Sequence, residues 1–429
     1  MSNLYDELTW RGLVSESTEG LADAFATDHV TAYIGFDPTA SSLHVGSLLT
    51  MMGLARLQRF GHSPIAVVGG GTGMIGDPKP IQERPLLSLE EIERNVDGIK
   101  PQLARLLDFD SKTNPARIVN NADWLATFDL LGFLRDTGKY FTVNYMLQKE
   151  AVNRRLESEE GISYTEFSYL LLQARDYLEL FDRYHCTLQL GGTDQWGNIT
   201  AGIELIRKLR AVKVHGLVWP LLTTADGTKF GKTEAGTVWL DPERTSPFEF
   251  YQFWLNTDDR DVVSYLKYFT FLDRNRIEEL ASVTQSAPER REAQRVLASD
   301  VTARVHGADE EEKARRASEQ LFSGNAFALP VQDLLATLGD APSTTITLQQ
   351  LQEERPITQW LVETRLVASR SEATRLIRGG GIYLNDERVM DEKRRLGVND
   401  LWEGALAVLG KGQRQKHVLR LAHGDGGRA

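Results

Sequence analysis

The sequence predicts an α/β protein: a Rossmann-like, doubly wound sheet domain, then a helical domain, then a small C-terminal α/β module. Over the first 220 residues, short apolar runs alternate with longer helical patterns, which is typical of a parallel sheet covered by helices on both faces. After about Pro247 the strand pattern disappears. A stretch rich in small and turn-forming residues then precedes a compact pattern of helix and strand.

The first domain contains four apolar runs that predict buried strands, at residues 30–36, 65–69, 118–120 and 187–190. A further strand is expected at residues 217–222. Longer patterns predict helices at residues 43–60, 88–107, 165–181 and 194–209. Ser88 and Glu91 form a capping-box pattern at the start of the second helix. Doubly wound sheets bind ligands at the carboxyl ends of their strands, so the site is expected there.

A second, helical domain is expected after about Pro247, with helices at residues 248–272, 274–283, 288–305 and 310–321. Residues 338–347, LGDAPSTTIT, predict a linker. Beyond it, Ser369 and Glu372 form a second capping-box pattern, glycines 379–381 end that helix, and residues 382–385 predict a strand. The expected domains are therefore 1–245, 246–337 and 348–429.

The composition is that of a globular protein, with 41% hydrophobic and 25% charged residues. The sequence has no run of about 18 uncharged apolar residues and no apolar segment at its N-terminus. We therefore expect no membrane partner and a cytoplasmic location. A single cysteine, Cys186, allows no intrachain disulfide and no zinc cluster, and it is expected to be a buried thiol. No metal site and no organic cofactor are predicted.

The net charge of −11 is distributed unevenly along the chain. Residues 355–429 hold 14 Lys and Arg against 9 Asp and Glu, a net charge of +5, so the other residues carry −16. A basic module on an acidic body is typical of a protein that contacts a polyanion in one place. A solvated basic face would produce the same pattern.

Two segments at predicted strand ends suit a nucleotide. Residues 36–47 run from a strand through a turn into a helix that begins near His44, where free N–H groups favour phosphate. Gly46 allows close approach of a ligand, although an ordinary capped helix would look similar. The glycines at 71, 73 and 76 match the dinucleotide fingerprint, but Pro78 disfavours the helix that this motif requires.

Two further segments carry polar side chains with regular spacing. Tyr169, Gln173 and Asp176 share one face of a predicted helix. This face is either a solvated polar surface or the lining of a pocket for a zwitterionic ligand with a polar tip. Tyr33 could meet them from the first strand. Lys229 and Lys232 lie in a Gly-bearing loop that suits polyphosphate, although surface lysines are common.

Taken in order, these segments resemble a class I aminoacyl-tRNA synthetase. Residues 44–47 are similar to its HIGH signature and residues 229–233 to KMSKS. The longer segments resemble the bacterial tyrosyl-tRNA synthetase family: YIGFDPTASSLHVG, GGGTGMIGDP, SYTEFSYLLLQARDY, LQLGGTDQWGNITAG, DGTKFGKTEAG and SPFEFYQFWLNTDDRDV. The resemblance covers nearly the whole chain, including a C-terminal module similar to an RNA-binding domain of a small-subunit ribosomal protein.

The resemblance implies ATP-dependent ligation of L-tyrosine to tRNA(Tyr) through a tyrosyl-adenylate, with release of pyrophosphate and AMP. Tyr33 and Asp176 would bind the phenol hydroxyl of tyrosine. The ammonium group would be bound by Tyr169, Gln173 and Asp77. Gln189 would line the same pocket. The residues expected around ATP are Gly35, Asp37, Thr39, His44, Gly46, Ser47, Gly192, Asp194 and Gln195. Those expected to hold the departing pyrophosphate are Lys229, Lys232 and Thr233, joined by Arg84.

The resemblance also implies a homodimer and Mg²⁺ that accompanies ATP, although the sequence shows no acidic cage for the ion. The basic residues expected to bind tRNA are Arg370, Arg375, Arg378, Lys393, Arg394 and Arg395. Ser47 stands where HIGH has its second histidine, while Phe230 and Thr233 replace Met and Ser of KMSKS. Both lysines of that motif are retained.

Three other functions fit parts of the pattern. A tryptophanyl-tRNA synthetase shares the fold, but Tyr33 and Asp176 favour a phenol as the ligand. A dinucleotide-dependent oxidoreductase would use the glycine-rich loop, against which Pro78 argues. A non-catalytic RNA-binding protein of the same build would not need His44 and the two lysines.

Overall fold

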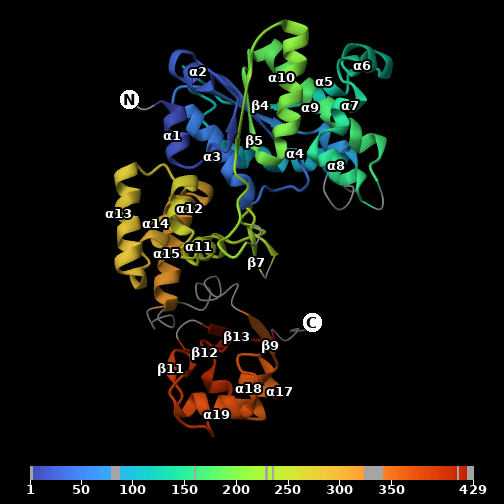
Figure 1. Cartoon of the computed structure of the whole chain (residues 1–429). Coiled ribbons are helices and arrows are strands. Elements are labelled where there is room, and N and C mark those ends of the chain that lie inside the picture. The colour runs from blue at the N-terminus through green and yellow to red at the C-terminus, as the bar shows by residue number, and fades with distance from the viewer. Residues whose placement is uncertain are drawn as a thin grey trace. The chain divides into compact units, whose positions relative to one another are not determined.

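The computed structural model describes residues 3–78, 87–158, 161–227, 230–233, 236–322, 342–412 and 415–422. It divides into two compact units, one of residues 1–245 with 254–305 and one of residues 246–253 with 306–429 (Figure 1). The boundaries expected at residues 245 and 337 stay predictions.

The first unit is built on a six-stranded sheet with the strand order β1-β6-β5-β2-β3-β4 (Figure 1). Its strands are β1 Glu16–Ser17, β2 Thr31–Phe36, β3 Ser63–Val68, β4 Arg117–Asn120, β5 Leu188–Gly192 and β6 His215–Trp219. Strands β2 to β6 are parallel, and β1 pairs antiparallel with β6 at one edge. The chain moves outward from β2 to β3 and β4, then returns to β5 on the other side of β2. The predicted doubly wound α/β fold is therefore confirmed.

Helices connect and cover these strands. They are α1 Leu4–Trp10, α2 Leu21–Thr27, α3 Val45–Arg59, α4 Leu89–Ala104, α5 Ala122–Leu125, α6 Leu130–Asp136, α7 Val143–Leu147, α8 Glu150–Leu156, α9 Tyr164–Tyr184 and α10 Trp196–Arg210. The predicted capping box of Ser88 and Glu91 is present at the start of α4. One buried core joins the sheet to α9 and α10, and Cys186 lies within it as the predicted buried thiol.

The helical part of the chain contains α11 Pro247–Leu255, α12 Val262–Phe269, α13 Arg274–Ser286, α14 Glu292–His306 and α15 Ala308–Phe322. The prediction of one helix over residues 248–272 is wrong, because α11 ends at Leu255 and α12 begins at Val262. Between them the Asp258 carboxylate accepts the backbone N–H of Arg260 at 2.8 Å. Side chains of this kind satisfy backbone donors outside a helix and so favour a break.

The C-terminal module has a five-stranded sheet in the order β11-β10-β12-β13-β9. Its elements are β9 Ser343–Ile346, α17 Leu348–Gln352, α18 Ile357–Glu363, α19 Arg370–Arg378, β10 Ile382–Leu384, β11 Glu387–Arg388, β12 Leu406–Lys411 and β13 Gln415–Leu421. The predicted linker is wrong at residues 343–346, because these partly β-branched residues pair in parallel with β13. Ser369 caps α19 as predicted, but the Glu372 carboxylate accepts the N–H of Ala368, so the capping box is incomplete.

Helix α4 supports the turn that follows β2. The Gln102 side chain accepts the N–H of Leu43 at 2.8 Å and donates to the Ser42 hydroxyl at 3.0 Å. The Asn95 amide donates to the carbonyl of Pro38 at 2.9 Å. Gly98 lies so close to this turn that a Cβ atom there would approach the Ser41 carbonyl oxygen to 2.1 Å. The turn is therefore held against one face of α4.

We predict that Gly98→Ala lowers thermal stability, although alanine normally stabilises a helix interior by about 1 kcal/mol relative to glycine. The added methyl group would force α4 away from the turn, at a cost of about 1–3 kcal/mol. Thermal unfolding followed by circular dichroism measures the effect. Gly197→Ala in α10 is the matched control, since its Cβ would first meet the flexible Lys149 side chain at 3.4 Å. A Gly98→Ala variant as stable as its parent would contradict this packing.

Candidate active site

The carboxyl ends of the parallel strands converge on one crevice. Strand β2 leads into the turn with Asp37 and Thr39, and β3 leads into the glycine-rich loop that ends at Asp77. Strand β5 ends at Gly192, directly before the short 3₁₀ helix η3, Thr193–Gln195. The order reverses between β2 and β5, which is where doubly wound sheets bind ligands.

The glycine-rich loop forms a single 3₁₀ turn, η1 Thr72–Met74, and Gly76 has a φ of +87°. A dinucleotide fingerprint requires its last glycine to open an α-helix that receives the pyrophosphate. The described residues after Gly76 form no helix up to Pro78. The loop therefore lacks the feature on which the oxidoreductase alternative depends.

A buried polar pair lies at the inner end of the crevice. The register of β2 on β5 places Tyr33 beside Gln189, and both side chains are 2% exposed. The Tyr33 hydroxyl and the Gln189 Oε1 have no hydrogen-bond partner within the described part of the chain. Burying a polar atom without a partner costs about 1–3 kcal/mol. Two such atoms on adjacent strands indicate that a polar ligand group completes them.

Asp176 approaches the same place from α9 and is also buried. Its carboxylate accepts the Trp124 indole N–H at 2.7 Å and the Asn121 amide at 2.9 Å. Burial raises the Asp176 pKa to about 7, while these two donors act in the opposite direction. Burial, and next the Asp176 charge, hold the Tyr33 pKa well above its usual value. The inner end of the crevice therefore presents a neutral phenol beside a carboxyl group.

A network of amides and carboxylates lies further out along the crevice. The Gln195 amide donates to Asp77 at 2.9 Å, and the Asn198 amide donates to Asp77 at 3.2 Å and to Gln173 at 3.0 Å. Gln173 in turn donates to Gln195 at 3.2 Å. These bonds bring the predicted residues of α9, the glycine-rich loop and η3 together. Their oxygen atoms form a group of acceptors suited to a cation such as an ammonium.

A cavity of about 500 Å³ opens beside this network. Among the side chains that line it are Asp77, Asp194, Asn198, Trp196 and Lys149. Within the described residues, no group of three or more His, Cys, Asp or Glu side chains is arranged to hold a metal ion. The described helices are all too short or too polar to pass through a bilayer.

Helix α3 begins directly after the turn that follows β2. His44 is its N-cap residue, and a Cβ atom on Gly46 would lie 2.7 Å from the imidazole ring, so a larger residue there would displace this ring. A side chain at Gly35 would meet nothing within 4 Å, which leaves open space above the end of β2. The positive end of the α3 dipole favours an anion near Gly46 and Ser47.

The lysine-bearing segment lies against this helix start. The Val238 carbonyl accepts the N–H of Val45 at 3.0 Å, and the Leu43 carbonyl accepts the N–H of Leu240 at 2.9 Å. A β-bridge joins His44 to Trp239. The two predicted signature segments, around His44 and around Phe230, are therefore neighbours in the fold. Lys229 and Arg84 lie outside the described residues, and only the backbone of Lys232 and Thr233 is described, within β7 Lys232–Thr233.

Three side chains of the site were missed by sequence reasoning: Asn121, Trp124 and Asn198. Asn121 directly follows the predicted strand 118–120, so its place at a strand end was a usable signal. Trp124 and Asn198 lie on helical segments, where nothing local distinguishes them from core or surface residues. Their roles follow only from the bonds to Asp176 and Asp77.

Comparison with known proteins agrees with this geometry. The family model "tRNA synthetases class I (W and Y)" matches residues 26–323, and a model of the tyrosine–tRNA ligase SYY-like C-terminal domain matches residues 333–419. The tyrosine–tRNA ligase of Roseiflexus castenholzii is 53% identical over 98% of this chain and 100% of that protein. The chain belongs to the tyrosyl-tRNA synthetase family.

Other members of the tyrosyl-tRNA synthetase family support the same conclusion. The tyrosine–tRNA ligase of Geobacillus stearothermophilus is 49% identical over 98% of this chain and all of that protein. The crystal structure of a C-terminally truncated mitochondrial tyrosyl-tRNA synthetase from Aspergillus nidulans superposes with a TM-score of 0.69. It is 31% identical and covers 75% of this chain and 94% of its own. A tryptophanyl-tRNA synthetase from Encephalitozoon cuniculi, 14% identical, shares the fold alone.

The C-terminal module of this tyrosyl-tRNA synthetase family member carries its predicted basic residues on the surface. All six are exposed: Arg370, Arg375, Arg378, Lys393, Arg394 and Arg395. Two of them form ion pairs, Arg378 with Glu392 and Arg394 with Asp400. The remaining four extend the basic surface that the net charge of this module predicts.

The raised pKa of Asp176 leads to a prediction for the pH dependence of the stability of the ligand-free chain. The folded chain holds this proton up to about pH 7, whereas the unfolded chain releases it near pH 4, so folding takes up a proton between these values. Stability should therefore fall as the pH rises through this window, by at most about 1.4 kcal/mol per pH unit from this group.

Asp176→Asn cannot ionise and should lack this contribution. Urea unfolding at pH 5 and pH 7.5 compares the two proteins, and groups common to both cancel in the difference. The parent should lose stability relative to the variant at the higher pH. Identical pH dependence of the two would mean that Asp176 is already ionised at pH 5 in the folded chain.

Proposed function

We propose that the chain activates L-tyrosine with ATP and transfers the tyrosyl group to tRNA(Tyr). The observation that carries this assignment is the buried pair of Tyr33 and Asp176, with the unpartnered Tyr33 hydroxyl at the inner end of the crevice. A substrate phenol can donate its hydroxyl proton to the Asp176 carboxylate and accept from Tyr33. Phenylalanine would leave these groups buried and unpaired, which costs binding free energy.

The rest of the substrate extends along the crevice toward the acceptor network. Its ammonium group replaces amide donors as the partner of Asp77 and Gln173, with the Tyr169 hydroxyl as a further acceptor. Gln189 closes the pocket beside Tyr33. This arrangement places the substrate carboxylate toward the start of α3, where the nucleotide is expected.

ATP binds between the ends of β2 and β5 and the first turn of α3. The open space above Gly35 leaves room for ribose and phosphate, while the His44 imidazole lies close to Gly46. Asp194 and Gln195 lie beside Gly192 for the ribose, while Asp37, Thr39, His44 and Ser47 surround the phosphates. Lys229, Lys232 and Thr233, with Arg84, hold the departing pyrophosphate. Mg²⁺ enters with ATP as part of the substrate.

The chemistry follows from these positions without a side-chain nucleophile. The substrate carboxylate attacks the α-phosphorus of ATP, and the bond to the bridging oxygen of pyrophosphate breaks. A hydroxyl of the terminal ribose of tRNA then attacks the carbonyl carbon of the adenylate, and AMP leaves. The protein contributes alignment of the reactants and stabilisation of phosphate charge, which account for most of the rate in reactions of this kind.

Two further features of the function concern assembly and location. Large apolar side chains on the consecutive helices α6 to α9 are exposed: Leu130 71%, Leu131 76%, Val143 59%, Leu156 46% and Tyr164 71%. Exposed apolar side chains on several consecutive helices support a partner, and we propose that this partner is a second copy of the chain. The homodimer works in the cytoplasm, and tRNA binds it through the basic residues of the C-terminal module.

We predict tyrosine-dependent exchange between ATP and radiolabelled pyrophosphate by the full chain, with no comparable exchange for phenylalanine or tryptophan. Asp176→Ala should reduce the tyrosine-dependent rate at least about 100-fold, because it removes the partner of the phenol hydroxyl from a desolvated site. Thermal unfolding of the variant shows whether it remains folded.

The second step is measured as attachment of radiolabelled tyrosine to tRNA(Tyr) by the same preparation. If tryptophan supported exchange and tyrosine did not, the proposed activity would be that of a tryptophanyl-tRNA synthetase instead. No exchange with any amino acid would contradict the proposed catalysis and leave only RNA binding.

A further inference from the structure

Phe230 lies between the two lysines of the KFGKT segment and is almost completely buried, with 4% of its surface exposed. Three aromatic residues enclose it: Trp254, Tyr265 and Phe269, which we call the aromatic socket. The ring centroid of Phe230 lies 5.7 Å from Trp254, 5.0 Å from Tyr265 and 5.4 Å from Phe269, on which it stacks at an interplanar angle of 19°. A ring buried among other aromatic rings fixes the backbone that carries it.

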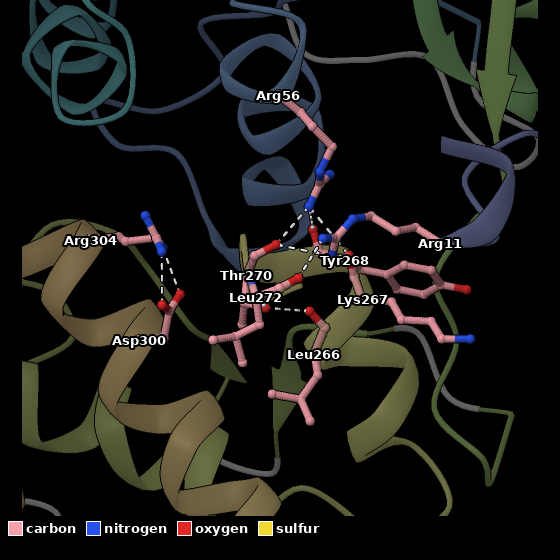
Figure 2. Close-up of polar contacts among 9 residues, drawn as sticks. All are labelled: Arg11, Arg56, Leu266, Lys267, Tyr268, Thr270, Leu272, Asp300 and Arg304. Carbon is pink, nitrogen blue, oxygen red and sulfur yellow. Dashed lines mark hydrogen bonds and ion pairs between the residues drawn. The ribbon is translucent and has the colours of Figure 1, made fainter. Parts of the chain in front are cut away.

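The aromatic socket is built largely on α12, and two arginines join the end of this helix to the sheet domain (Figure 2). Arg11 follows α1, and Arg56 belongs to α3; both are buried, with exposures of 2% and 1%. Their guanidinium groups donate to backbone carbonyl oxygens at the C-terminal end of α12, over distances of 2.7–3.3 Å: those of Lys267, Tyr268, Thr270 and Leu272.

Carbonyl groups in the last turn of a helix generally lack partners within the helix, and a positive charge is favoured at a helix C-terminus. Burial, and next the neighbouring Arg11 charge, lower the Arg56 pKa to about 9, so the group stays charged at neutral pH. The hydrogen bonds of Arg56 therefore fix the end of α12 to the side of α3.

Helix α3 also carries the other signature segment at its first turn. The segment that follows Phe230 returns to this turn, where Gly231 packs so closely that an added Cβ would lie 2.7 Å from Val45. The contacts form a closed circuit: from α3 through Arg56 to α12, from the aromatic socket to Phe230, and from Gly231 back to α3. The circuit fixes the separation between the two signature segments.

We propose that Phe230 is a positioning residue for adenylate formation, which acts by holding its neighbours Lys229 and Lys232 at the phosphates of ATP. This inference rests on the proposed function. Consecutive Cα atoms are about 3.8 Å apart, so an anchored Phe230 restricts where the adjacent lysine can reach. Charges that stabilise a transition state must be placed accurately, and a misplacement of about 1 Å can cost about 100-fold in rate.

The test compares Phe230→Ala and Phe230→Leu in the full chain by tyrosine-dependent pyrophosphate exchange, together with equilibrium binding of tyrosine. Phe230→Ala should lower the maximal exchange rate about 10- to 100-fold. Tyrosine affinity should change less than about twofold, because the phenol pocket lies at β2 and α9. Phe230→Leu should recover most of the rate, since leucine refills much of the aromatic socket.

Two comparisons separate positioning from general loss of stability. Phe25→Ala removes an equally buried phenylalanine from α2 and should leave the maximal exchange rate near that of the parent at a temperature where both are folded. The double variant Lys229→Ala with Phe230→Ala should have its maximal exchange rate reduced by less than the product of the two single-variant factors. Both substitutions act through the charge of the Lys229 side chain, so their effects should not multiply.

Exchange by the unchanged chain is measured first, and its absence would overturn the proposed function itself. If the unchanged chain is active, two results would overturn the role of Phe230 alone. One is a Phe230→Ala variant with the parental rate. The other is a double variant whose loss equals the full product of the single losses.

Discussion

The pairing of β2 with β5 is the constraint on which the site depends. It brings together two strands that are more than 150 residues apart in the sequence and reverses the strand order between them. The same register places Tyr33 beside Gln189, so the polar inner end of the pocket is a direct product of strand pairing. A hydrogen bond from Gln195 to Asp77 then joins the loop after β5 to the loop after β3.

Specificity in this crevice comes from buried polar atoms that the fold leaves incomplete. Asp176 is held by Asn121 and Trp124, and the outer acceptors are held by each other, so these groups are fixed before a substrate arrives. The Tyr33 hydroxyl and the Gln189 carbonyl are different, because the described chain offers them no partner. A ligand that supplies the missing bonds gains binding energy, and one that lacks the hydroxyl does not. The catalytic end instead depends on the start of α3 and on the separation between two segments of the chain.

Local patterns were sufficient to predict much of this molecule. The alternating strands and helices, the capping box at Ser88 and the common face of Tyr169, Gln173 and Asp176 all follow from periodicity that a short window contains. The break between α11 and α12 carried a signal too, in the Asn-Thr-Asp-Asp run that a long apolar pattern concealed. Strand β9 was missed because its pairing with β13 decides its conformation, and that partner lies more than 70 residues away.

The rest could not be predicted because it depends on contacts between distant parts of the chain. The bonds from Arg11 and Arg56 to the end of α12 join residues more than 200 positions apart, and an arginine on a helix has no local mark of such a role. The same holds for the aromatic socket around Phe230. The roles assigned to individual side chains, including Lys229 and Arg84, stay predictions.

The central claim is that Tyr33 and Asp176 recognise a phenol hydroxyl, and calorimetric titration of the ligand-free chain tests it most directly. Tyrosine and phenylalanine differ only in that hydroxyl, so their affinities report on it alone. Two buried groups left unpaired at about 1–3 kcal/mol each predict tyrosine binding at least about 30-fold tighter than phenylalanine. Replacement of Tyr33 by phenylalanine should reduce this ratio. Equal affinity for the two amino acids would contradict the account.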